Sequence, residues 1–160
     1  MTLPVQWFAK HMPIGGSPNG SEQDASGDGN STSGEDRLFV YGTLRSHQPA
    51  HNLLGPNVRR LDAAITSGTL WALPAGYPGF LQGIGTVHGE VVWLNDIATT
   101  FDRLDAYEGN EYARVTCAAV LSSGQPTSAW IYVLSDPGLT ENAEWIASGD
   151  WIAYQARMIK

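Results

Sequence analysis

One segment near the beginning of the chain limits where a hydrophobic core can form. Residues 15–36 consist largely of Gly, Ser, Asn, Asp and Pro, and they contain no aromatic residue. A segment of this composition has too little apolar surface to offset the conformational entropy lost on ordering. We therefore predict that residues 1–36 form a disordered acidic tail and that residues 37–160 form a single folded domain.

The tip of this tail, residues 3–8, is apolar and includes Trp7 and Phe8. It can be interpreted as a docking peptide for a partner or as an untethered terminus, and we favour the terminus. It lacks the continuous apolar run of a signal peptide, and no part of the chain approaches the roughly 18 apolar residues of a membrane span. We therefore expect a cytoplasmic protein that is not inserted in a membrane.

Charge and cysteine content restrict the classes of partner. The net charge is −7, of which the first 36 residues carry −4 because they contain one lysine and five carboxylates. The domain itself has no basic stripe, whereas nucleic acids are bound mainly through Lys and Arg, so we expect no nucleic-acid partner. The single cysteine, Cys117, allows no internal disulfide and no cysteine-based metal cluster, and it permits a reducing compartment.

Short apolar runs separated by turn residues predict several strands in the domain. The predicted strands are residues 38–41, 63–73, 86–94, 112–121 and 127–134. Gly68 interrupts the second of these strands and predicts a bulge. The Pro- and Gly-rich residues 74–79 indicate a loop, and residues 122–125 have the spacing of a hairpin turn.

One segment has the period of an amphipathic helix. Ile97, Phe101 and Leu104 fall on one face of residues 96–107. Asn95 or Asp96 is expected to cap its beginning, and a glycine follows its end. Several strands with one helix define an α+β protein, for which we predict a small, mixed, closed or nearly closed β-barrel with short flanking helices.

The first candidate functional segment is Tyr41-Gly42-Thr43-Leu44-Arg45, where a buried strand ends in a glycine. Glycine permits close approach of the backbone, and successive N–H groups at such a turn can converge on an anion. The same residues also fit an ordinary turn from strand to loop with Tyr41 in the core. The pattern alone leaves both interpretations open.

The second candidate is Glu108, in the last turn of the predicted helix. A carboxylate there lies at the negative end of the helix dipole, which disfavours it by about a few tenths of a kcal/mol or more. If Tyr107 or Tyr112 also screens it from water, both effects disfavour the anion, and the group becomes suitable as a general acid or base near neutral pH. The alternative interpretation is an exposed carboxylate at a helix end.

Other reactive side chains are weaker candidates. His47 and His51 are four residues apart but have no third ligand close in the sequence, so we expect no metal site. His88 lies on a predicted strand and is interpreted as structural. Cys117 falls on a core face, without a nearby histidine to activate it. Glu90, also on a strand, is expected to face solvent.

Taken together, these segments resemble the γ-glutamylcyclotransferase-like family, also called AIG2-like. The matching segments occur in family order at residues 39–45, 76–79, 87–91, 104–109, 112–114 and 148–151. The most specific part is the combination of Tyr-Gly-Thr-Leu, Asp-x-x-Glu-Gly and Tyr-x-Arg at these distances. The resemblance covers about residues 38–151, and the first 36 residues lie outside it.

The resemblance implies a small β-barrel enzyme, of the amidine-lyase or acyl-transfer type, that releases 5-oxoproline and a free amine or amino acid from a γ-glutamyl amide. It implies that the substrate's own α-amine attacks, with Glu108 as general acid and base. The loop from Tyr41 through Gly42 and Thr43 to Leu44 would cradle the γ-glutamyl group. Tyr112, and with it Tyr132, would line the pocket.

The same resemblance sets expectations about partners. The expected ligand is a small γ-glutamyl substrate, no cofactor or metal is required, and the chain is expected to be a monomer or dimer. The loop at residues 71–83, with Tyr77 and Phe80, is expected to help select the leaving group. Because a fold does not determine an activity, another small-molecule amide or amine activity, or a ligand-binding adaptor, remains the alternative.

Overall fold

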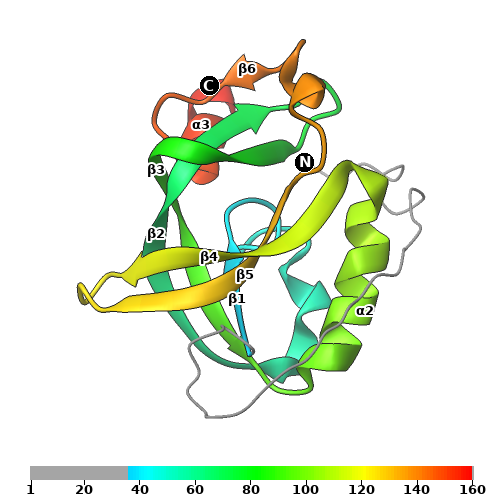
Figure 1. The fold of residues 1–160 in the computed structure, drawn as a ribbon, viewed down its shortest axis with the longest axis vertical. Coiled ribbons are helices and arrows are strands. Elements are labelled where there is room, and N and C mark those ends of the chain that lie inside the picture. Colours follow the sequence, from blue (N-terminus) through cyan, green and yellow to red (C-terminus); the bar gives the residue numbers. More distant parts are fainter. Residues whose placement is uncertain (1–35, 160) are drawn as a thin grey trace.

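The structure, a computed structural model, describes residues 36–159 (Figure 1). The predicted disordered tail and the apolar tip at residues 3–8 lie outside the described residues, apart from Asp36. None of the helices among the described residues has the length and apolar character needed to cross a membrane.

Five strands close into a barrel, which confirms the predicted α+β class and mixed barrel (Figure 1). The strands are β1 (Arg37–Val40), β2 (Val58–Ala72), β3 (Pro78–Leu94), β4 (Tyr112–Leu121) and β5 (Pro126–Leu134). They lie in the order β3-β1-β5-β4-β2, and β2 pairs with β3 again to close the ring. The sheet is mixed because β1 is parallel to β5 and antiparallel to β3.

The β2–β3 pair is longer than the sequence predicts. Strand β3 begins at Pro78, inside the predicted loop, and it contains three glycines before the predicted beginning at residue 86. Glycine is a weak strand former, and pairing with residues Thr69 to Ala72 of β2 holds this part of β3 in the extended conformation. The predicted bulge at Gly68 is confirmed by a register shift between Ser67 and Thr69. A Cβ atom at Gly68 would overlap the ring of Phe80, so only glycine fits there.

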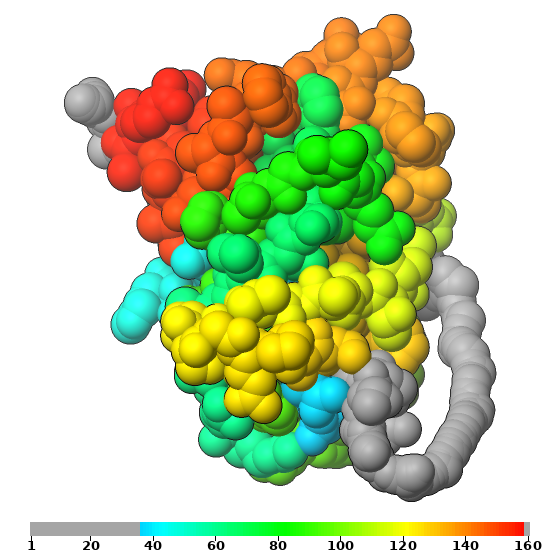
Figure 2. All heavy atoms as spheres, turned by 60° about the vertical axis from the view of Figure 1, so that its left-hand side comes forward, coloured from blue at the N-terminus to red at the C-terminus, as the bar shows by residue number. Residues whose placement is uncertain are grey.

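The β4–β5 hairpin and the main helix match their predictions closely. Strand β4 has the predicted bounds, β5 begins one residue earlier, and the hairpin forms a band across the face shown in Figure 2. Helix α2 spans Ile97–Glu108 and buries Phe101 and Leu104 as predicted. Its capping was predicted incorrectly in one respect: Asp96 is the N-cap residue, but its backbone is left-handed and its side chain makes no capping hydrogen bond.

Strand β1 is buried on both of its faces. Leu38 and Val40 pack in a cluster with residues of α2, whereas Phe39 and Tyr41 pack in a second cluster with Val91. This alternation follows from the two-residue period of a strand, and it explains why the run is continuously apolar. The strand therefore lies in the core from Leu38 to its last residue, Val40.

The remaining elements are short and lie at the loops and at one end of the barrel. The 3₁₀ helices are η2 (His51–Leu53), η3 (Gly55–Asn57), η4 (Gly109–Glu111) and η5 (Pro137–Thr140). Strand β6 (Glu144–Trp145) pairs with the end of β2, and helix α3 (Trp151–Ile159) lies beside it (Figure 1). Trp151 anchors α3 because its side chain is buried in the same cluster as Tyr41.

Candidate active site

A small pocket lies where the end of β1, the beginning of β3 and the end of α2 meet. Its lining consists of Phe39, Tyr41, Gly42, Thr43, Leu44, Pro78, Glu108 and Tyr132. The fold thus brings together the two candidate segments that are more than sixty residues apart in the chain. Tyr112 is placed differently: its hydroxyl donates to the carbonyl of Pro78 at 2.6 Å, so it supports the pocket wall from behind.

The loop after β1 forms the backbone side of the pocket. The N–H of Arg45 donates to the carbonyl of Gly42 at 3.0 Å, and the N–H of Ala50 donates to that of Thr43 at 3.0 Å. A Cβ atom at Gly42 would overlap Cγ of Pro78, so the loop approaches β3 in a way that only glycine permits. In the described part of the chain, the N–H groups of Thr43 and Leu44 donate to no acceptor.

Glu90 anchors this loop, and the prediction that it faces solvent is wrong. Its side chain is only 8% exposed. One carboxylate oxygen accepts a hydrogen bond from the N–H of Ser46 and the other from its hydroxyl, both at 2.7 Å. A buried carboxylate is tolerated when it is paired in this way. The partner lies 44 residues away in the sequence, so the local pattern on the strand could not reveal it.

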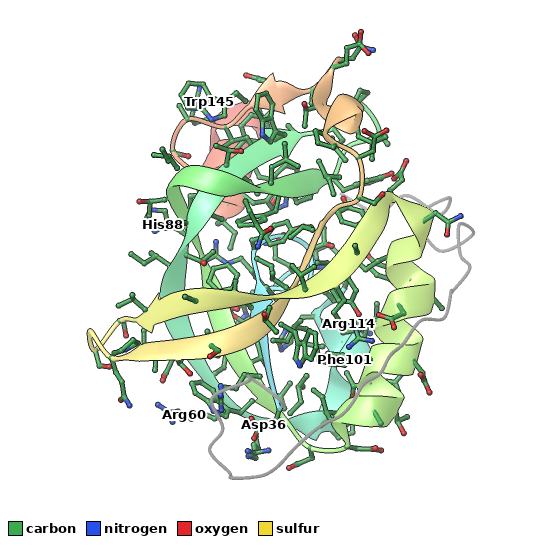
Figure 3. The ribbon with its side chains drawn as sticks, viewed as in Figure 1. Asp36, Arg60, His88, Phe101, Arg114 and Trp145 are labelled. Atoms are coloured by element: carbon green, nitrogen blue, oxygen red, sulfur yellow. The ribbon has the colours of Figure 1, made fainter. Side chains whose placement is uncertain are left out.

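Two further contacts hold the loop from its other side. Arg45 forms an ion pair with Asp150 at 3.2 Å, and Nδ1 of His51 lies 2.8 Å from the carbonyl oxygen of Leu44. His51 therefore has a structural contact to the loop. His88 lies on the outer side of β3 and is exposed, away from the pocket (Figure 3). Among the described residues, no group of three or more His, Cys, Asp or Glu side chains is placed to hold a metal ion.

Glu108 is buried at the last residue of α2, with only 5% of its surface exposed. Its charge acts on five tyrosines: Tyr41, Tyr77, Tyr107, Tyr112 and Tyr132. Burial raises the pKa of each of these phenols, and the negative charge of Glu108 contributes to raising all five. The phenols therefore stay protonated near neutral pH. The site combines one buried carboxylate with neutral hydroxyl groups and two backbone N–H groups that have no acceptor among the residues that the structure describes.

Several of these hydroxyls have fixed partners, which makes the pocket rigid. The Tyr41 hydroxyl donates to the carbonyl of Tyr132 at 2.7 Å. The Tyr107 hydroxyl lies 3.5 Å from the hydroxyl of Thr43, which joins α2 to the loop. Tyr77 is 3% exposed and donates to Glu111 at 2.8 Å. Phe80 is fully buried against Tyr41 inside the barrel and does not line the pocket, contrary to the role expected for it.

A second layer holds α2 and its glutamate in position. Arg114 on β4 makes two hydrogen bonds to Asp105, at 3.1 and 3.0 Å, and its guanidinium lies over the rings of Phe101 and Trp130 (Figure 3). Asp105 also accepts a hydrogen bond of 2.6 Å from the hydroxyl of Tyr132. Sequence reasoning assigned no role to Asp105 or Arg114, although both lie in segments that match the family.

Cys117 is placed as predicted, facing the core of the barrel. Burial raises the pKa of its thiol to about 11, although a hydrogen bond with Thr66 acts in the opposite direction. The thiolate is therefore scarce at neutral pH, and the residue does not line the pocket.

The closed mixed barrel is the fold of the γ-glutamylcyclotransferase class of small-barrel proteins. The chain belongs to the γ-glutamyl cyclotransferase, AIG2-like family, whose pattern matches residues 38–153. This confirms the resemblance inferred from the sequence.

Named relatives and a solved structure agree with this assignment. The chain is 38% identical over 119 residues to the γ-glutamylcyclotransferase family protein YtfP of Escherichia coli K12, covering 72% of this chain and 96% of that protein. It is 30% identical over 126 residues to the γ-L-glutamyl-butirosin B γ-glutamyl cyclotransferase of Niallia circulans, covering 74% and 76%. The crystal structure of PH0828 from Pyrococcus horikoshii is similar with a TM-score of 0.57 and 26% identity, covering 76% of this chain and 94% of that one.

Proposed function

We propose that this protein is a cyclotransferase that converts a γ-glutamyl amide into 5-oxoproline and a free amine or amino acid. The observation that carries the proposal is the burial of Glu108 in one pocket with the backbone of Gly42, Thr43 and Leu44. Family membership supplies the reaction class, and the pocket supplies a carboxylate and hydrogen-bond donors that suit it.

The chemistry of this reaction requires mainly positioning and proton transfer. The nitrogen of the substrate's α-amine forms a bond to its own γ-carbonyl carbon and closes a five-membered lactam. The bond from that carbon to the leaving nitrogen then breaks, and the leaving nitrogen gains a proton. Because the nucleophile belongs to the substrate, holding amine and carbonyl together can lower the barrier by several kcal/mol. No external nucleophile enters the balance.

Each side of the pocket has a role in this proposal. Glu108, as a carboxylate, takes a proton from the attacking amine and returns it to the leaving nitrogen, which is typically worth about 10²–10⁴ in rate. The N–H groups of Thr43 and Leu44 hold a substrate oxygen. The tyrosines restrict the folded shape that the γ-glutamyl group can adopt.

A mass-spectrometric assay for 5-oxoproline tests the proposal. The panel consists of γ-glutamyl amines, γ-glutamyl amino acids and γ-glutamyl-lysine isopeptides, each given to the wild type and to Glu108→Gln. We expect 5-oxoproline from the wild type and a loss of at least about 10²-fold in the variant. Matching thermal unfolding curves would show that the variant is folded.

Two outcomes would contradict the proposal. If Glu108→Gln released 5-oxoproline at the wild-type rate, the role of Glu108 would be wrong. If free glutamate appeared in place of 5-oxoproline, water would be the nucleophile, and the protein would be an amide hydrolase on the same scaffold.

A further inference from the structure

One side of the barrel is built from strands that are almost without charge. Residues 63–89 and 115–135 contain no Asp, Glu, Lys or Arg. Strand β2 pairs with β3 along one edge and with β4 along the other, so these two ranges are neighbours in the sheet. Figure 2 shows the resulting surface, on which β2, β3 and the β4–β5 hairpin lie side by side.

The centre of this surface is apolar and exposed. Ile65 on β2 lies directly opposite Val120 on β4, and their side chains are 38% and 40% exposed. Because side chains alternate across a strand, residues two positions along point to the same side. We call this surface the Ile65 face and define it by its exposed residues, Ala63, Ile65, Ser67, Thr86, His88, Ala118 and Val120. None of them lines the candidate active-site pocket.

The size of the Ile65 face limits what can bind to it. A stable interface between two proteins takes about 20–30 residues from each partner. The Ile65 face has far fewer, and the charged residues Asp62, Glu90 and Arg114 end its strand segments. A second copy of this chain would therefore bury too little surface here to form a stable dimer, whereas a short apolar peptide has the matching size and polarity.

The chain itself contains such a peptide. Residues 3–8, Leu-Pro-Val-Gln-Trp-Phe, combine four large apolar side chains with no charge. They lie outside the described residues and outside residues 38–153, which match the family. The sequence alone favours an untethered terminus over a docking peptide for this segment. The Ile65 face adds what the sequence could not show, namely a surface on the same molecule that the segment would fit.

The length of chain between the segment and the barrel suits this contact. Arg37, the first residue of β1, pairs with Trp93, which pairs with Arg60, and Ile65 follows on the same strand as Arg60. Two strand spacings of about 4.8 Å and a rise of about 3.3 Å per residue place Ile65 roughly 20 Å from Arg37. A linker with the length and the Gly- and Ser-rich composition of residues 9–36 is expected to span roughly 26–32 Å. A tether matched to the distance gives an effective concentration of about the millimolar range.

We propose that residues 3–8 bind to the Ile65 face of the same molecule, with Trp7 and Phe8 covering Ile65 and Val120. Because the contact is intramolecular, the modest affinity of a short peptide is sufficient. The inference does not depend on the proposed cyclotransferase activity, since the Ile65 face lies apart from the pocket that contains Glu108.

Methyl NMR of the full chain tests the contact directly. The ring of Trp7 should shift the δ1-methyl resonance of Ile65, which Ile65→Val identifies, and Trp7→Ala should remove this shift. Ile97 at the beginning of α2 supplies the control methyl group, because α2 lies on the other side of the barrel (Figure 1). Its resonance should be the same in the wild type and in Trp7→Ala.

Cleavage by trypsin gives a second, independent measurement. Lys10 is the only lysine or arginine among residues 1–36, and it follows Phe8 closely. Ile65→Glu places a charge at the centre of the Ile65 face. We expect cleavage after Lys10 to become at least about threefold faster in this variant, because the rate follows the population in which the segment is not bound. Met158→Glu introduces the same charge at an exposed apolar residue of α3 and should leave the rate unchanged.

Any of three results would overturn the inference. The first is an Ile65 methyl resonance that is identical in the wild type and in Trp7→Ala, which would show that Trp7 does not reach the face. The second is equal cleavage after Lys10 in Ile65→Glu and Met158→Glu. The third is a shift of the Ile65 resonance that disappears on dilution, because a contact within one molecule does not depend on concentration, and a second copy would then be the occupant.

Discussion

Glu108 and Glu90 are both buried carboxylates, but their surroundings give them different uses. Both oxygens of Glu90 accept hydrogen bonds from Ser46, so this side chain fixes the loop. Glu108 lies at the end of α2 and is one of the residues that line the pocket. A buried acid whose two oxygens both accept hydrogen bonds from a loop fixes that loop, whereas one that borders a pocket is a candidate for proton transfer.

Replacing Glu90 should therefore weaken both the fold and the proposed activity. Glu90→Ala leaves the N–H and hydroxyl of Ser46 without their acceptors, which should lower the free energy of unfolding by about 1–3 kcal/mol. Urea unfolding measures this change, and Asp102→Ala, at an exposed position on α2, is the control. Equal effects of the two substitutions would show that the Ser46 contact contributes nothing to stability.

A single methyl group at Gly42 should disturb the pocket. The backbone of Gly42 is not left-handed, so alanine meets no conformational penalty there, but its Cβ would overlap Pro78. The loop or β3 must shift, and small misplacements in a site of this kind can cost about 10²-fold in rate. We expect kcat/KM for 5-oxoproline release to fall at least about tenfold in Gly42→Ala. Wild-type kinetics in this variant would mean that the close approach of loop and strand is unimportant.

At the scale of elements, α2 depends on the hairpin that follows it. The guanidinium of Arg114 joins β4 to Asp105 and lies over two aromatic rings, one from α2 and one from β5. A planar, forked donor makes this contact possible, and a lysine ammonium cannot reproduce it. The helix end that bears Glu108 is thus positioned by a contact between elements as well as by its own packing.

Arg114→Lys tests this dependence with the charge preserved. Both partners are partly exposed, with 18% and 28% of their side chains accessible, so solvent screening limits the expected loss of stability to about 1–2 kcal/mol. Urea unfolding measures the loss, and Arg157→Lys on α3, which is exposed, is the control. Combining Arg114→Lys with Asp105→Asn should give less than the sum of the single effects. Additive effects would contradict the contact.

Across the whole molecule, the buried tyrosines should make the fold sensitive to alkali. Burial raises the pKa of Tyr41, Tyr112 and Tyr132 well above the ordinary value of about 10, and the pKa of Tyr77 and Tyr107 is also raised. Below about pH 10 these phenols are neutral in both the folded and unfolded states, so their protonation does not lower the free energy of unfolding. Above about pH 10 the tyrosines of the unfolded chain lose their protons at a lower pH than the buried tyrosines of the folded chain. The free energy of unfolding therefore falls as pH rises.

This alkaline effect can be measured by two methods together. Urea unfolding at pH 8, 9.5 and 11 should give a falling free energy of unfolding, with the largest loss between the last two values. Absorbance at 295 nm should show phenolate appearing together with unfolding, because the folded state holds the phenols neutral. If all the tyrosines titrated near pH 10 in a folded protein, their burial would not have the effect described here.

The sequence by itself determined the features that depend on neighbouring residues. Short apolar runs between turn residues located β1, β4 and β5, the period of 3.6 located α2, and Gly68 marked a bulge, because each of these patterns lies within a few neighbouring residues. Family-specific segments identified the protein class and singled out Glu108 and the Tyr41 loop as candidates. Their catalytic and binding roles remain predictions that the proposed assays test.

Only the tertiary structure decided the features that depend on distant partners. Glu90 is buried because Ser46 reaches it across the barrel, and β3 extends back to Pro78 because β2 pairs with it. The pairing of Asp105 with Arg114 likewise arises from a contact between separate elements. A local sequence pattern predicts burial and turns. It does not predict which distant group will form a hydrogen bond with a buried polar atom, because that partner is brought close only when the chain folds.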